Sequence, residues 1–212
     1  MIAVTDVGHA RRQLAFPFLF VLLWSTGFIA LKYGLPYAPP LTFLLYRFAL
    51  VAALMTVVAL ATQAGWPATL GEAGHVAVAG WLVHGAYLGG VFVAVARGMP
   101  TGTAALLVGL QPILTVFLAR GWLGERVVPR QWLGLALGLG GLVLVVSRKF
   151  GSTNEVTAVT LAAITVALLS ITAGTLYQKR YVAPADVRGA NAIQLAAALV
   201  VTLPLDQQVQ KR

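Results

Sequence analysis

The sequence predicts an all-α, polytopic membrane protein with about seven transmembrane helices. Of its 212 residues, 59% are hydrophobic and only 10% are charged, whereas soluble domains carry about 25% charged residues. The apolar residues are gathered into runs long enough to cross a bilayer as helices, and charged residues mark the ends of these runs. The 22 glycines fit the same class, because small residues let membrane helices pack closely.

Composition and motifs also exclude several classes of function. The formal net charge of +9 does not indicate a nucleic-acid partner, because such a surface needs its Lys and Arg on one folded face. The chain contains no cysteine, which removes disulfides, thiolate nucleophiles and cysteine-ligated metals. There is no nucleophile and base pair, metal-ligand cluster or glycine-rich phosphate loop in the required context. We therefore expect no enzyme activity, no cofactor and no metal.

Seven apolar segments account for the expected spans. In chain order they cover residues 16–31, 41–62, 76–96, 103–119, 132–146, 156–177 and 190–205. The first follows Arg11 and Arg12, as in a signal sequence, but no small-residue cleavage site is apparent, so we interpret it as an uncleaved helix. The turn PYAPP ends it, because proline cannot continue a helix. The seventh segment is only about as long as a minimal span of 17 residues.

The basic residues predict the orientation of these spans, because cytoplasmic loops of membrane proteins are enriched in Lys and Arg. The loops on the side of the N-terminus hold Arg11, Arg12, Arg120, Arg126, Arg130, Lys179, Arg180 and Arg188. The opposite side holds Lys32, Arg97, Arg148 and Lys149. This excess favours a cytoplasmic N-terminus.

A weak internal repeat relates the first and sixth spans. An offset of 147 residues superposes Gly27 on Gly174 and Lys32 on Lys179. Five spans separate the two copies, and an odd number inverts the second copy in the membrane. Inverted repeats are typical of secondary transporters, in which the substrate lies near the midplane between the copies.

Four pieces of the chain resemble the EamA-type permeases of the drug/metabolite transporter superfamily. They are WSTGFIALKYGL, PPLTFLLYRFALVAAL, GVFVAVARGMPTGTAALLVGLQPILTVFLARGWLGERV and GTLYQKRY. The most specific elements are LGER at 123–126 and YRF at 46–48. The resemblance implies ten helices in two inverted five-helix halves, the export of amino acids or other small metabolites, and the bacterial inner membrane.

Mapped onto this chain, the resemblance implies four parts. Residues 1–15 form a cytoplasmic segment, residues 16–147 the first five-helix repeat and residues 148–205 an incomplete second repeat of two helices, followed by a polar tail at 206–212. The chain therefore ends after the seventh of ten expected helices, as a truncated permease would.

Several polar or aromatic residues within the spans are candidates for lining a substrate cavity. Intramembrane ionisable residues usually face a cavity or a partner, which makes His84 a candidate together with Tyr87, three positions later on the same face. The alternative is a neutral His84 hydrogen-bonded to a neighbouring helix. Trp24 and Ser25 lie near the middle of the first span, where packing through Gly27 is the competing interpretation.

Three further candidates come from the second, fourth and sixth spans. Arg47 lies roughly two turns inside the second helix, where it pairs with an anionic substrate, gates the outer mouth or bonds carbonyls at broken helix ends. Gln111 and Pro112 lie mid-span in the fourth helix, where proline should produce a kink with polar groups at membrane depth. Tyr177 of the sixth span completes the expected lining.

No carboxylate falls within an expected span. All six acidic residues fall in loops, caps or tails, and they are Asp6, Glu72, Glu125, Glu155, Asp186 and Asp206. Nothing matches the first-helix glutamate of the small multidrug exporters in the same superfamily, so proton antiport by that route is not expected. Glu125 is interpreted as structural, pairing with Arg126 or Arg130 in the turn before the fifth helix.

These features together predict transport of a small metabolite or amino acid, outward and by alternating access. The expected partners are a small-molecule substrate and the lipid bilayer, with a homodimer or separately supplied C-terminal helices completing the cavity. The alternatives are a non-transporting membrane scaffold or interaction module, and an inactive fragment of a transporter.

Overall fold

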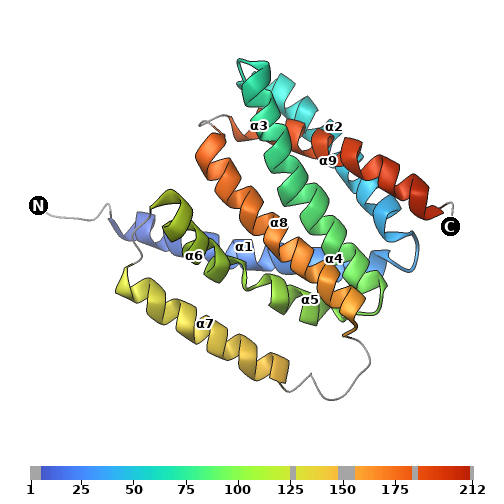
Figure 1. The fold of residues 1–212 in the computed structure, drawn as a ribbon. Coiled ribbons are helices and arrows are strands. Elements are labelled where there is room, and N and C mark those ends of the chain that lie inside the picture. Colours follow the sequence, from blue (N-terminus) through green and yellow to red (C-terminus); the bar gives the residue numbers. More distant parts are fainter. Residues whose placement is uncertain (1–5, 125–127, 148–155, 183–185, 211–212) are drawn as a thin grey trace, which may run out of the picture.

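The predicted all-α class is confirmed by the computed structural model, which describes residues 6–124, 128–147, 156–182 and 186–210. Every regular element in these ranges is helical (Figure 1). The elements are α1 (Asp6–Gly34), α2 (Pro40–Ala61), α3 (Leu70–Gly80), the π-helical turn η1 (Trp81–Ala86), α4 (Tyr87–Ala96), α5 (Thr101–Val108), α6 (Gln111–Leu123), α7 (Pro129–Ser147), α8 (Ala158–Tyr181) and α9 (Val187–Gln210).

Each of the seven predicted spans coincides with helical chain. Within the described residues, the five stretches found long and apolar enough to cross a membrane are Pro40–Ala61, Leu70–Ala96, Thr101–Trp122, Ala158–Tyr181 and Val187–Pro204. The first and fifth predicted spans correspond to α1 and α7. The chain is therefore an integral, polytopic membrane protein.

Local sequence signals explain several helix ends. Pro40 occupies the first position of α2, where its missing N–H is not needed. The hydroxyl of Thr69 accepts a hydrogen bond from the Glu72 backbone N–H at the start of α3. Thr157 forms a capping box with Thr160 at the start of α8. Gly124 ends α6 in the left-handed conformation, with φ 68°.

Two of the spans are irregular near their middle. The third span changes from α to π geometry over η1 and then returns to α geometry in α4. The fourth span breaks at Gly109 and Leu110, between α5 and α6, and Pro112 lies in the first turn of α6. This break confirms the kink that the sequence predicted there.

The C-terminal end of α9 differs from the sequence expectation. The segment from Asp206 was expected to be a polar tail, yet α9 continues to Gln210. Asp206 is only 6% exposed, and the Thr42 hydroxyl at the start of α2 donates a hydrogen bond of 2.7 Å to its carboxylate. The assignment of Asp206 to a tail was wrong, because α2 provides the carboxylate with a polar partner.

The two C-terminal helices pack mainly against the second, third and fourth spans. Helix α8 lies along α4, η1 and α6, while α9 lies along α2, α3 and η1 (Figure 1). In Figure 1, α1 and α8 cross obliquely, with their N-terminal ends on opposite sides of the view. The largest buried side chains, such as Phe48 and Phe92, belong to the single core cluster between these helices.

Glycines set how closely these helices approach. A Cβ on Gly80 would overlap the backbone of Gln194, and one on Gly90 would press on the carbonyl oxygen of Ala163 and on Ala167. A Cβ on Gly174 would overlap Leu82 and Val83. These contacts involve backbone atoms, so a larger residue would separate the helices.

Gly90→Ala should destabilise the protein, because its methyl group meets the α8 backbone. The neighbouring Gly89 has no atom near its would-be Cβ, so Gly89→Ala should stabilise the helix by about 0.5–1 kcal/mol. Thermal unfolding in detergent measures both changes. Equal unfolding temperatures for the two variants would contradict the close approach of α4 and α8.

Candidate functional site

Two neighbouring cavities lie between the described helices and share the side chains of Trp24 and Phe28. The central cavity, of about 260 Å³, is bounded by α1, α2, η1, α4 and Ile171 of α8. The lateral cavity, of about 850 Å³, lies between α1 and the broken span α5–α6. Both volumes suit small-molecule ligands rather than macromolecules.

The central cavity brings together four of the predicted site residues. It is lined by Trp24 from α1, Arg47 from α2, His84 from η1 and Tyr87 from α4. Arg47 is near enough to both Tyr87 and His84 for electrostatic interaction. Tyr87 is only 7% exposed, so its ring is a fixed part of the wall. The remaining lining side chains are apolar.

The π-helical turn η1 explains how His84 and Tyr87 reach this cavity. A π turn widens the helix and changes its register locally, and such turns are frequent at functional sites. His84 lies within η1, and Tyr87 is the first residue of α4. No hydrophobic pattern in the sequence indicated this turn.

Gln194 of α9 is a site residue that sequence reasoning missed. The residue is 3% exposed, and its side chain lies close enough to His84 for a polar interaction. Its backbone packs directly on Gly80, just before η1. An amide within an apolar span is the one sequence signal that could have indicated Gln194. The contact between Gln194 and His84 depends on how two distant helices pack.

The lateral cavity contains two more of the predicted residues, Ser25 and Gln111. The Gln111 amide donates a hydrogen bond of 3.4 Å to the Thr175 hydroxyl of α8, and that hydroxyl donates to the Ile171 carbonyl at 2.7 Å. The break between α5 and α6 is therefore tied to α8. Pro112 lines the same cavity.

Tyr177 is not brought together with the other predicted residues. Its hydroxyl lies 2.6 Å from Nδ1 of His75 on α3, and its ring packs 4.8 Å from that of Tyr181. His75 stacks on Tyr181 as well, with ring centroids 5.5 Å apart. Tyr177 lines neither the central nor the lateral cavity, and its part in substrate binding stays a prediction.

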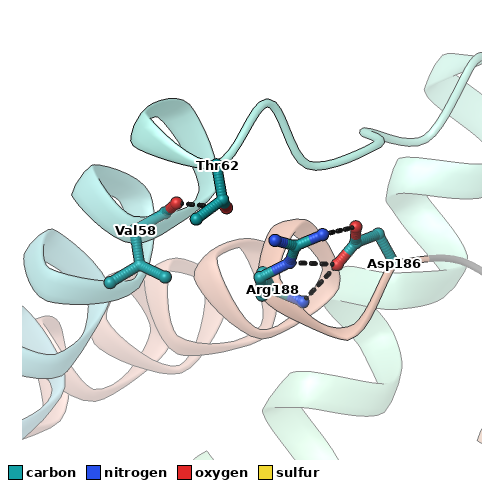
Figure 2. Close-up of polar contacts among 4 residues, drawn as sticks. All are labelled: Val58, Thr62, Asp186 and Arg188. Carbon is teal, nitrogen blue, oxygen red and sulfur yellow. Dashed lines mark hydrogen bonds and ion pairs between the residues drawn. The ribbon is translucent and has the colours of Figure 1, made fainter.

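An ion pair stands at the start of α9, beside the end of α2 (Figure 2). The Arg188 side chain donates to both carboxylate oxygens of Asp186, at 2.9 and 2.6 Å, and the Arg188 guanidinium and backbone N–H hold the pKa of that carboxyl well below its usual range. The loop after α2 packs here, with Gly65 touching Gly189. Figure 2 also shows the Thr62 hydroxyl donating to the Val58 carbonyl in the last turn of α2.

Glu125, which was expected to pair with Arg126 or Arg130, lies outside the described residues. Within the described ranges, no cluster of three or more His, Asp or Glu side chains is arranged to hold a metal.

The fold is that of a polytopic membrane protein with two cavities of small-molecule size. Residues 13–147, more than half of the chain, match the EamA-like transporter family. The chain belongs to this family.

Curated relatives carry transporter names. The chain is 24% identical over 195 residues to a probable amino-acid metabolite efflux pump of Escherichia coli (strain K12), which covers 92% of this chain and 62% of that protein. It is 28% identical over 204 residues to the uncharacterized transporter YvbV of Bacillus subtilis (strain 168), covering 93% and 63%. It is 27% identical over 186 residues to the uncharacterized inner membrane transporter YedA of Escherichia coli (strain K12), covering 88% and 59%.

The chain thus spans less than two thirds of the length of these relatives. No solved structure matches it.

Tyr177→Phe should lower stability by about 0.5–1.5 kcal/mol, because it removes the hydroxyl that joins α8 to His75 of α3. Thermal unfolding measures the loss. Tyr46→Phe is the matched control, since Tyr46 is 73% exposed and should tolerate the change. A Tyr177→Phe protein with unchanged stability and weakened ligand binding would instead assign Tyr177 to substrate contact.

Proposed function

We propose that this protein moves a small metabolite, of about the size of an amino acid, outward across the bacterial inner membrane by alternating access. The observation that carries the proposal is the central cavity, whose wall is formed by the first three spans together with Ile171 of α8. His84 and Tyr87 of the third span line it, and Gln194 of the seventh span lies outside the lining, close to His84. When a site lies between two repeats, rocking of one repeat against the other opens the site to each side of the membrane in turn.

The family and the relatives support this proposal. The efflux pump of Escherichia coli is named for amino-acid metabolites, and YedA is named as an inner membrane transporter. An amino-acid-sized solute would fit the volume of about 260 Å³ in the central cavity. We propose a part in the transport path for the six predicted residues that line the two cavities: Trp24, Ser25, Arg47, His84, Tyr87 and Gln111.

The proposed orientation places the N-terminus and the α2–α3 loop in the cytoplasm. The natural absence of cysteine makes single-cysteine labelling direct. An impermeant maleimide added to intact cells should label Arg97→Cys, at the end of α4, and should leave Ala68→Cys, before α3, unlabelled until the cells are opened. Both positions are exposed. The reverse pattern would contradict a cytoplasmic N-terminus.

Transport itself is tested by reconstitution in liposomes. Labelled amino acids, amines and small carboxylates should be screened for saturable counterflow. His84→Gln should lower that flux about tenfold, because loss of one well-placed hydrogen bond is worth about 1.4 kcal/mol. Tyr46→Phe, on the exposed face of α2, is the control and should keep wild-type flux. A correctly folded chain with no saturable flux for any solute would contradict autonomous transport and favour the scaffold alternative.

A further inference from the structure

The described wall of the central cavity carries positive charge and no negative charge. Among its described lining residues, Arg47 is the one side chain that carries a permanent charge, and none of them is acidic. Arg47 is an exposed residue about two turns into α2, and its side chain lines the cavity. At this depth in a membrane an unpaired charge is costly. A bound anion would relieve that cost.

The acidic side chains that the structure places are engaged elsewhere. Glu72 accepts a hydrogen bond from the Ala68 backbone before α3, Asp186 pairs with Arg188, and Asp206 accepts from Thr42. None of these three lines the central cavity. A ligand ammonium would therefore enter a site with a nearby guanidinium and no carboxylate from the described wall. Like charges repel strongly where water is scarce.

The remaining wall favours a ligand with an apolar, flat body. Aromatic rings come from Trp24, Phe28 and Phe92, and the other contacts are mainly with branched aliphatic side chains. Tyr87 and His84 add two hydrogen-bonding groups close to Arg47. A guanidinium binds a carboxylate through two parallel hydrogen bonds, a geometry that an ammonium group does not offer.

We propose that the central cavity selects small carboxylates with a net negative charge and an apolar ring, and discriminates against zwitterionic amino acids of the same size. Arg47 binds the carboxylate, and the aromatic side chains enclose the ring. This inference rests on the proposed function, since it names the substrate class of the same cavity.

Three probes that share one phenylethyl scaffold test the charge preference. They are 3-phenylpropionate, phenylalanine and phenethylamine, which are respectively anionic, zwitterionic and cationic at pH 7. Titration calorimetry with the whole chain in lipid nanodiscs measures their affinities. We expect 3-phenylpropionate to bind at least tenfold more tightly than phenylalanine, and phenethylamine to show no saturable binding.

Variants at Arg47 assign the preference to its guanidinium. Arg47→Gln should weaken 3-phenylpropionate binding at least tenfold while changing phenylalanine binding little, so that the preference disappears. Arg47→Lys keeps the charge without the planar fork and should fall between the two. Arg97→Gln removes an exposed arginine that does not line the cavity and should bind like the wild type.

The outcomes separate this inference from the transport proposal. Equal or tighter binding of phenylalanine, or a preference that survives in Arg47→Gln, overturns the charge selectivity while leaving transport intact. Binding of none of the three probes to a chain with a normal thermal transition also overturns it. In that last case, saturable flux of another solute in liposomes would preserve the proposed function, and its absence would remove both.

Discussion

Backbone contact at three glycines holds the two C-terminal helices against the third span, and the central cavity depends on it. Gly80 admits the backbone of Gln194, Gly90 admits Ala163 and Ala167, and Gly174 admits the side of η1. Lipid gives no hydrophobic drive for helix association, so close van der Waals contact must supply much of the cohesion. If these helices stood further apart, Gln194 would not reach His84, and the cavity would lose its polar link to the second part of the chain.

Much of the fold could be predicted because hydrophobic runs and proline are local signals. The seven apolar segments all became helices, and Pro112 marked the break of the fourth span. Asp206 was misplaced because a polar ending resembles a tail, and only the position of α2 shows that Thr42 meets it. Sequence reasoning judged each segment by its own composition and had no information on which helices become neighbours.

For the candidate site too, some residues could be predicted from local sequence and others could not. Trp24, Arg47, His84 and Tyr87 were selected for being polar or aromatic at membrane depth, and they line one cavity. Tyr177 met the same criterion but faces His75 and Tyr181, since depth alone does not give the direction of a side chain around its helix. Gln194 required knowledge of how α9 packs.

The π-helical turn has a consequence for how this family can vary. A π turn is equivalent to one residue inserted into an α-helix, which the chain accommodates as a local bulge. Deleting one residue from Trp81–Ala86 would therefore let the third span become a continuous α-helix, with α3 and α4 keeping nearly their present faces. A deletion in a regular part of the helix would instead rotate the residues after it by about 100°, since an α-helix has 3.6 residues per turn. A single-residue length change at η1 can thus alter the ligand wall around His84 while the helix seam at Gly90 stays in register.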